Sequence, residues 1–243
     1  MFAYKGDIVN FMNFNQLIMS PGESVISPDL IDLYQSGANC NIAPTAQFAL
    51  EVKIGHVESI GAYAQIGDGA DISFGVNLGT ECIIGMDCKV GSFALLGSRS
   101  VMLRDSTLGS MSSVRERVVI GKEVAIPFGS QIDSGMVIPS QETITTLSNF
   151  GGKRRVVTIH GSEDGPRFSI GCQDSVSWLR ISERINKAID TVDTSAAHYR
   201  KYLDVFNAVG LLVQNAFDAD LANGRHDETI AQANALRSAT NDF

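Results

Sequence analysis

Histidine and cysteine are the residues of this chain best suited to proton transfer, nucleophilic attack or metal binding, and there are four of each. They are His56, His160, His198, His226, Cys40, Cys82, Cys88 and Cys172. A positioned histidine can take a proton from a hydroxyl or an amine. Three histidines that converge can hold zinc and leave its fourth position open for a water or substrate. No phosphate-binding glycine loop and no Gly-x-Ser-x-Gly nucleophile motif accompanies them.

A six-residue repeat governs the middle of the chain and decides where these residues lie. A large apolar residue recurs at every sixth position from Ile42 to Ile138, seventeen times without a slip. The next residue is often glycine, and the residue four places after the apolar one is usually small. An unbroken period of this kind predicts a coil that turns a corner every six residues. We expect the large residue to fill the interior, the small one to fit near the corner, and glycine to supply backbone angles that a Cβ resists.

This pattern resembles the hexapeptide-repeat superfamily of left-handed parallel β-helices, whose best-known members are acyltransferases and gamma-type carbonic anhydrases. The resemblance covers about 97 of the 243 residues and bears on the fold more than on the function. It implies three hexads in each triangular coil, so that residues eighteen apart stack at the spacing of neighbouring strands. It also implies a homotrimer. The predicted fold class is therefore mainly β: a left-handed parallel β-helix with an N-terminal cap and a C-terminal α-helical region.

The sequence divides into four predicted segments. They are an N-terminal cap over residues 1–41, the β-helix over 42–140, connecting strands or a hairpin over 141–172, and an α-helical region over 173–243. The third segment contains two short predicted strands, Arg154 to His160 and Arg167 to Gly171. In the fourth segment the apolar spacing becomes helical, and Tyr199, Leu203, Phe206, Val213 and Phe217 are expected to point inward on one helix. Asn223 and Gly224 end that helix, and Asp227 is expected to cap a short last one.

Stacking at eighteen residues also predicts which outward side chains share a corner. One corner is apolar while the other two carry charged residues. Its outward places hold His56, Val57, Phe74, Phe93, Met111 and Phe128. An apolar stripe of this length on an outer surface usually marks an interface. We therefore expect this stripe to meet a neighbouring subunit or the chain's own C-terminal helices. It consists of Val57, Phe74, Phe93, Met111 and Phe128.

A second corner is expected to carry a charged ladder. Glu81, Arg99 and Arg117 are eighteen apart and occupy the same place in their hexads. Such a ladder could bind an anion, or it could form solvated ion pairs that add little stability. The ion-pair interpretation is favoured.

The family resemblance makes His56 the candidate catalytic base. Hexapeptide acyltransferases place one histidine in a groove between subunits, beside the acyl-CoA, and His56 is the only histidine within the coil. Packing in an interface is the favoured explanation for a histidine at the end of an apolar column. The chain lacks the ejected loop and the Gly-Ala-Gly-Ser-Val-Val-like ending found in many such enzymes. A zinc site of the carbonic anhydrase type is not expected, and Cys82 and Cys88 are predicted to fill the core.

Two functional interpretations follow. The leading one is a non-catalytic homotrimeric structural or assembly protein, in which the triangular coil is a rigid scaffold. A phage or virion component is one form of it, since residues 168–179 loosely resemble a segment of phage and prophage proteins. This interpretation requires no cofactor. The alternative is an acyltransferase that moves an acyl group from CoA or an acyl carrier to a small hydroxyl or amine, with His56 as general base and acyl-CoA as the donor.

The overall composition limits the partners. The net charge of −8 argues against nucleic acid and against anionic membranes, because both attract basic residues. No apolar stretch is long enough to span a bilayer, and the first residues lack the pattern of a secretory signal. Four cysteines do not make a disulfide framework. We expect synthesis in the cytoplasm, with the final site undetermined, and partners that are other copies of the chain or proteins of a larger assembly.

Overall fold

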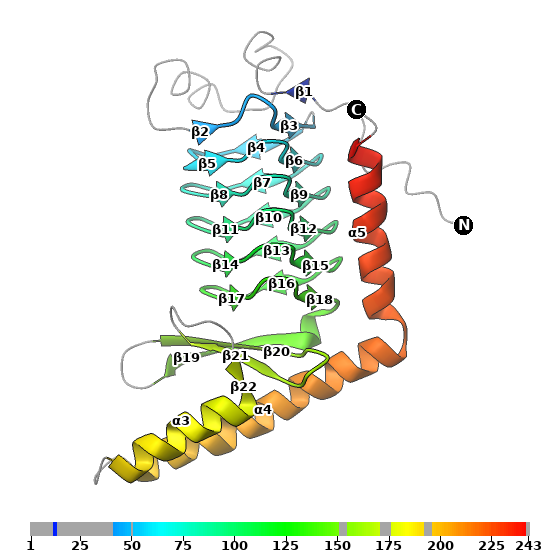
Figure 1. The fold of residues 1–243 in the computed structure, drawn as a ribbon. Helices are drawn as coiled ribbons and strands as arrows, with labels where there is room; N and C mark the ends of the chain where they lie inside the picture. Colours follow the sequence, from blue (N-terminus) through cyan, green and yellow to red (C-terminus); the bar gives the residue numbers. More distant parts are fainter. Residues whose placement is uncertain are drawn as a thin grey trace.

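The computed structural model describes residues 12–13, 41–49, 51–150, 155–170, 176–191 and 196–241. These residues form a triangular coil, an antiparallel sheet below it and three helices (Figure 1). One helix rises beside the coil, and the other two lie across its lower end.

The coil consists of seventeen strands of two residues each, arranged in three parallel sheets. Face A contains β3 (Gln47–Phe48), β6 (Gln65–Ile66), β9 (Ile83–Ile84), β12 (Val101–Met102), β15 (Val119–Ile120) and β18 (Val137–Ile138). Face B contains β2 (Asn41–Ile42), β5 (Ser59–Ile60), β8 (Asn77–Leu78), β11 (Leu95–Leu96), β14 (Ser113–Val114) and β17 (Gln131–Ile132). Face C contains β4 (Lys53–Ile54), β7 (Asp71–Ile72), β10 (Lys89–Val90), β13 (Thr107–Leu108) and β16 (Ala125–Ile126).

Each strand pairs with the equivalent strand of the next coil. Val90, for example, pairs with Ile72 on one side and with Leu108 on the other. The second residue of every strand is the large apolar one and is buried. The interior is therefore a continuous stack of aliphatic side chains with one phenylalanine, Phe48, near its upper end. The predicted left-handed parallel β-helix is confirmed.

Small residues fill the space beside the corners, as the repeat predicts. Cys82 and Cys88 occupy this place, are fully buried and have free thiols. Ser100 and Ser112 occupy it further down the coil, and their hydroxyls donate to the carbonyl oxygens of Arg115 and Pro127 at 2.8 and 2.9 Å. Buried hydroxyls in this place therefore find acceptors in the corner backbone, which removes the cost of burying them.

The expected role of glycine in the repeat is wrong. Left-handed backbone angles occur at the fourth place of the hexads, mostly in residues with side chains, such as Tyr63, Arg99 and Met111, whose φ angles are 57°, 60° and 58°. The glycine in the second place is needed for a different reason, which is close contact between coils. A Cβ on Gly97 would lie 2.4 Å from the backbone carbon of Arg115 in the next coil.

The upper edge of face A is paired by the N-terminal segment. β1 (Met12–Asn13) runs antiparallel to β3, with Met12 opposite Phe48. Pairing an edge strand in this way leaves fewer open backbone groups for another chain. The rest of the predicted cap over residues 1–41 lies outside the described residues, apart from Asn41.

A four-stranded antiparallel sheet follows the coil. After a short 3₁₀ helix, η1 (Gln141–Thr143), the strands are β19 (Ile144–Phe150), β20 (Arg155–His160), β21 (Arg167–Ile170) and β22 (Val176–Ser177), in that spatial order. The two predicted strands of this segment correspond to β20 and β21 and are confirmed. β19 was not predicted, because its threonine-rich sequence has little apolar alternation.

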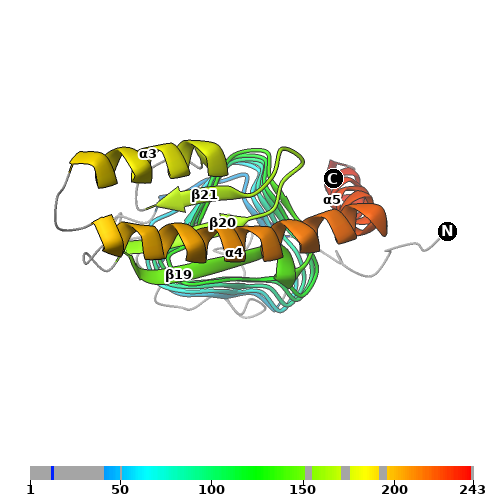
Figure 2. The ribbon, with the colours of Figure 1, turned by 90° about the horizontal axis from the view of Figure 1, so that it is seen from below.

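The helices are α3 (Trp178–Thr191), α4 (Ala196–Ala222) and α5 (Arg225–Asn241). α3 and α4 pack on the sheet, as the view from below shows (Figure 2). Phe206, Val213 and Phe217 are buried on α4 as predicted, and the side chain of Tyr199 lies outside the described residues. The last helix differs from its prediction: it is 17 residues long and begins at Arg225, so Asp227 lies inside its first turn. Within the described residues no helix is long and apolar enough to cross a membrane.

α5 covers the outer side of face A. Ala233 is fully buried and Leu236 partly buried against Ile83, Val101 and Val119. The guanidinium of Arg237 also donates a hydrogen bond to the carbonyl oxygen of Arg99 at 3.1 Å. From β9 to β18 the outward residues of this face are apolar and β-branched, and the helix packs on them; the upper strands β3 and β6 have glutamines in this place.

Candidate functional site

The corner between faces C and B carries an exposed row of large apolar side chains. We call this row the apolar edge, and it consists of Phe74, Phe93, Met111 and Phe128. Their side chains are exposed by 50% to 59%. The rings of Phe74 and Phe93 meet edge to face at a centroid distance of 5.3 Å. α5 packs on face A, and α3 and α4 on the lower sheet, so none of the described helices covers the edge.

Two residues of the edge stand in a backbone conformation that bulky side chains rarely adopt. Phe93 and Met111 both have φ angles of 58°. Glycine, asparagine and aspartate adopt this region far more readily than phenylalanine or methionine. A bulky apolar residue here is unfavourable for the isolated coil twice over, through the backbone and through its contact with water.

Val57 is not part of the edge, which corrects the prediction. It is fully buried in the coil interior, while Glu58 beside it is exposed. In the regular hexads the fifth residue points inward, but here that residue is a glutamate, which is costly to bury without a partner. The chain turns Val57 inward in its place.

His56 lies at the upper end of the apolar edge. Its imidazole stacks on the ring of Phe74, with centroids 5.4 Å apart and planes 27° apart. The side chain is partly exposed. The residue's carbonyl oxygen accepts a hydrogen bond from the backbone of Gly75 at 2.7 Å. The ring is thus held against an aromatic surface and still faces solvent.

The two faces that meet at the edge differ in charge. The outward positions of face B hold only uncharged residues, and they are Asn41, Ser59, Asn77, Leu95, Ser113 and Gln131. Face C carries Lys53 and Lys89 on either side of Asp71, all exposed. The two lysines are two strands apart, or about 10 Å. Each lysine is eighteen residues from Asp71, so this arrangement was available from the sequence, but the prediction followed the corner residues alone.

The charged ladder is present at the corner between faces B and A. Arg99 Nε lies 3.0 Å from Glu81 Oε2, and both side chains are about half exposed. Arg117 lies one coil further along and is exposed. An exposed pair of this kind contributes little to stability.

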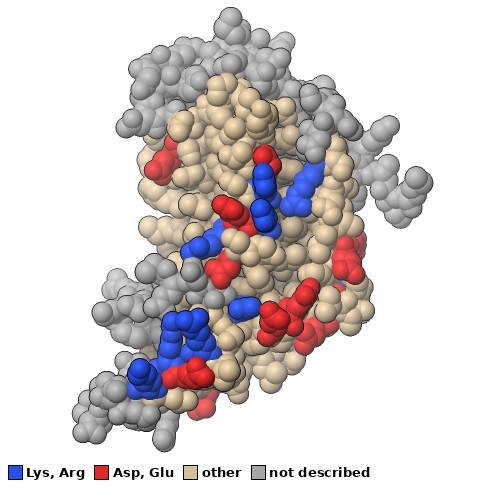
Figure 3. Space-filling model, viewed as in Figure 1, with Lys and Arg blue, Asp and Glu red and all other residues tan. Residues whose placement is uncertain are grey.

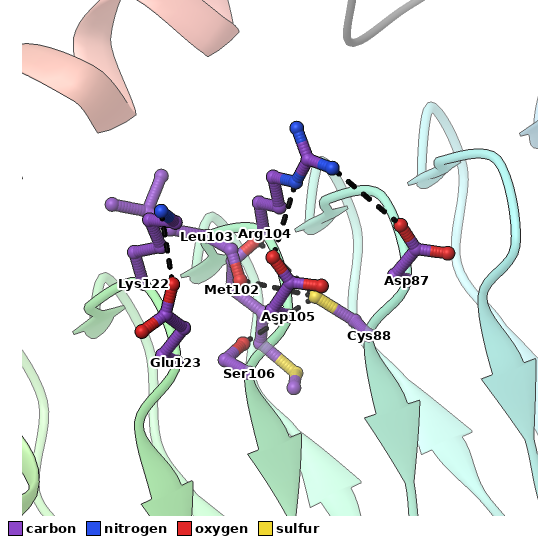
Figure 4. A network of polar contacts seen from close by, with 9 residues as sticks. All are labelled: Asp87, Cys88, Met102, Leu103, Arg104, Asp105, Ser106, Lys122 and Glu123. Carbon is purple, nitrogen blue, oxygen red and sulfur yellow. Dashed lines mark hydrogen bonds and ion pairs between the residues drawn. The ribbon is translucent and has the colours of Figure 1, made fainter.

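A second polar network lies at the remaining corner, between faces A and C (Figure 4). The guanidinium of Arg104 contacts the carboxylates of Asp105 at 3.1 Å and Asp87 at 3.9 Å. Below it, Lys122 Nζ lies 2.9 Å from Glu123 Oε1. Burial raises the pKa of the nearby Cys88 thiol to about 11, against a smaller opposing effect of its hydrogen bond with Ser106. This thiol is therefore protonated and unsuited to nucleophilic attack.

The other histidines do not approach His56. His160 is buried in the lower sheet, and burial lowers its pKa to about 4. His226 is buried at the start of α5, where its ring meets Phe217 at 5.5 Å. The side chain of His198 lies outside the described residues, as do Cys40 and Cys172. In the described part of the chain, no three histidine, cysteine or acidic side chains gather where a metal ion could bind.

One cleft of about 390 Å³ lies away from the edge, where α5 starts beside the lowest coils. It is lined by Lys122, Glu123, Ser140, Gln141, Arg225 and Glu228, among others. Its basic groups already have acidic neighbours, since Arg225 Nη1 lies 2.9 Å from Asp220 Oδ1. Basic and acidic side chains are also interspersed on the surface seen in Figure 3. The cleft offers no concentration of one charge for an ionic ligand.

The regular turn at each corner, repeated every six residues with eighteen-residue register, decides the fold. The middle of the chain is a hexapeptide-repeat β-helix. No protein-family model and no curated protein matches the sequence.

Solved structures with some likeness to the β-helix include PerB from Caulobacter crescentus in complex with CoA and GDP-perosamine, at 22% identity and a TM-score of 0.25. That match covers 41% of this chain and 45% of PerB, so it spans about half of the known protein. A hexapeptide transferase family protein from Anaplasma phagocytophilum matches at 19% identity and a TM-score of 0.24, over 40% of this chain and 72% of the other. Values this low say nothing about the reaction of this chain.

Proposed function

We propose that the protein associates into a homotrimer around the apolar edge, and that His56 at the upper end of this edge is the general base of an acyltransferase. The donor would be CoA or an acyl carrier, and the acceptor a small hydroxyl or amine. The observation that carries the proposal is a half-exposed row of aromatic side chains that ends in a solvent-facing histidine.

The association is supported by what lies on both sides of the edge. A water-exposed row of three phenylalanines and a methionine is unfavourable in a monomer. The outward strand positions of face B beside it are uncharged, so another subunit could cover these positions without desolvating a charge. Of the coil's three outer faces, A is covered by α5 and C is charged, which leaves face B and the edge for a subunit contact.

The catalytic role is supported by the surroundings of His56. Proton removal from an alcohol or amine needs a base that is held in place and reachable. Stacking on Phe74 holds the imidazole, and its partial exposure keeps it reachable. On the adjoining face C, Lys53 and Lys89 flank Asp71 and leave one net positive charge, which would favour a diphosphate group held by either lysine. The apolar edge would accommodate the uncharged arm of the donor.

A non-catalytic assembly protein is the second candidate. It is favoured by the ring contact between Phe74 and Phe93, which fills this part of the edge with aromatic side chains rather than with groups that do chemistry. The described residues 51–138 also run without a loop that could enclose a substrate. This candidate needs the same trimer, so the two differ only in whether a donor binds beside His56. The more specific prediction of a phage or virion component stays a prediction.

Calorimetric titration with CoA and acetyl-CoA separates the candidates. We expect the wild type to bind CoA with a micromolar dissociation constant. His56→Ala should change this constant by no more than about threefold but should abolish acyl transfer to a panel of small amines and sugars. Lys53→Ala and Lys89→Ala should each weaken CoA binding by about tenfold, as expected for the loss of one charged contact with a phosphate. Lys122→Ala, at the opposite corner, is the matched control and should leave binding unchanged. No heat at millimolar ligand with an intact trimer would rule out the enzyme and leave the assembly protein.

A further inference from the structure

α4 has a second apolar face, on the side opposite the one that packs on the sheet. Phe206, Val213 and Phe217 are buried on the inner side. On the outer side Val205, Leu211 and Leu212 are exposed by 46% to 68%. The outer side faces away from the coil, because in the view from below α4 lies in front of β19 and β20 (Figure 2). These residues form the lower end of the molecule.

The outer residues follow the spacing of a helix-pairing seam. Five exposed residues make up this set, and we call them the α4 seam: Val205, Ala208, Leu212, Asn215 and Ala219. They are separated alternately by three and four positions, which is the spacing of the contact positions in a coiled coil. Such positions stay on one side of a helix over the roughly 20 Å that these residues span. The inner side of α4 already provides its described apolar contacts to the sheet and to α3.

We propose that the α4 seam is an interface with a second copy of this chain, in which two α4 helices pack antiparallel across a two-fold axis. An axis near position 210 sets Ala208 against Leu212 of the second copy, and Leu212 against its Ala208. Small residues then face large ones throughout the centre of the contact, which permits a close approach of the two helices. Val205 lies beside Asn215 of the second copy at either end.

Charge selects the antiparallel orientation. The sequence places Arg200, Lys201 and Asp204 in the N-terminal part of α4, which leaves one net positive charge there, and Asp218 in its C-terminal part. Asp218 is exposed, and one of its oxygens accepts a hydrogen bond from Gln214 at 2.8 Å. Antiparallel packing brings position 201 of one copy, a lysine in the sequence, near position 218 of the other, an aspartate. Parallel packing would align like charges instead and would be disfavoured.

This contact is distinct from the one at the apolar edge. The edge runs along the side of the β-helix, whereas the seam lies at its lower end. The two interfaces therefore join copies side by side and end to end, and each can be removed without touching the other. The seam does not rest on the proposed enzymatic function.

Sedimentation velocity at micromolar concentration tests the seam through Leu212→Glu. We expect the variant to have half the mass of the wild-type particle, because a carboxylate at the centre of the contact must be desolvated. Asn207→Glu adds the same charge at an exposed position of α4 outside the seam and should keep the wild-type mass. Circular dichroism must show unchanged helix content in both variants. An unchanged mass for Leu212→Glu, or equal loss in both variants, overturns the proposal.

A charge exchange tests the orientation and the identity of the occupant. Asp218→Lys should weaken end-to-end association by about tenfold, and Lys201→Asp in the same chain should restore it. Failure of the double variant to restore the mass overturns the antiparallel arrangement. Flotation of the wild type with phosphatidylcholine vesicles, lost in Leu212→Glu and accompanied by no self-association, would overturn the proposal in favour of a lipid surface.

Discussion

Two apolar surfaces lie on the outside of the same β-helix, and only one is covered by the chain itself. On face A, the outward residues Ile83, Val101 and Val119 are buried beneath α5. At the apolar edge, Phe93 and Met111 remain more than half exposed. Both surfaces arise from the same repeat and differ in which place of the hexad holds the apolar residue.

The difference follows from the shape of the two surfaces. The outward residue of each strand lies on a flat face, where β-branched side chains stack in a shallow row. A straight helix of 17 residues spans about 25 Å, or roughly five strand spacings, so α5 matches such a face. The edge projects from a corner, where Phe93 and Met111 share the left-handed conformation of other corner residues such as Arg99 but expose large apolar side chains to water. A surface that costs stability in the isolated chain is better explained by a partner than by folding.

The largest expected effect comes from charging the covered surface. Val101→Asp places a carboxylate beneath α5, in the apolar cluster with Ile83, Val119 and Ala233. We expect the free energy of unfolding to fall by roughly 3–5 kcal/mol, as for an uncompensated buried charge, and α5 to become sensitive to protease. Urea denaturation and limited proteolysis measure the two effects.

Thr107→Asp is the matched control for that substitution. Thr107 is the next outward residue of the same coil, on face C beside Lys89, and is partly exposed. The free energy of unfolding of the Thr107→Asp variant should differ from that of the wild type by less than about 0.5 kcal/mol. Equal losses in the two variants would show that the covering by α5 contributes nothing.

The lower sheet, which α4 covers, offers a second test of burial through pH. Burial lowers the pKa of His160 to about 4, opposed by a backbone contact with Gly161 and by the charge of Asp133, and assisted by Arg167. The folded protein thus keeps His160 neutral while the unfolded chain binds a proton below about pH 6.5. The stability that depends on the neutral, buried His160 is fully present above that pH and is lost as the pH falls toward about 4. The slope is at most about 1.4 kcal/mol per pH unit.

His160→Gln should flatten this part of the pH dependence, because glutamine does not titrate. Urea midpoints between about pH 7.5 and about pH 4.5 measure the slope for the wild type and the variant. His56→Gln removes the histidine at the apolar edge and is the control. If the slope in His160→Gln equals that of the wild type, the acid loss of stability has another origin.

The coil could be predicted from the sequence because one repeat determines it. Each large residue contacts its equivalents eighteen positions away, so period and register suffice to identify face and place. Val57 shows where this rule fails. The inward-pointing fifth place of its hexad holds Glu58, whose charge is costly to bury, so Val57 points inward instead. A strict six-residue period does not predict this exchange. The second-place glycines were recognised for the wrong reason, because close contact between coils depends on the three-dimensional stacking rather than on local angles.

The regions outside the repeat were predicted less completely. Inward residues such as Phe206 and Val213 follow from helical spacing, but the surface that each helix covers does not. The docking of α5 on face A depends on the outward residues of strands far away in the sequence. Lys53 and Lys89, by contrast, follow from the eighteen-residue register of face C, which places them on either side of Asp71.

The smallest expected effect on stability, and the largest on association, comes from Phe93→Asn. Asparagine adopts the left-handed conformation of this position more readily than phenylalanine, and this gain offsets the lost contact with Phe74. We expect the free energy of unfolding of the monomer to change by less than about 0.5 kcal/mol, while side-by-side association weakens at least tenfold in sedimentation equilibrium. Tyr63→Asn is the matched control, because Tyr63 has the same conformation and exposure at another corner. If both variants keep the oligomer, the apolar edge is not the subunit contact, and the proposal that His56 works in a groove between subunits fails with it.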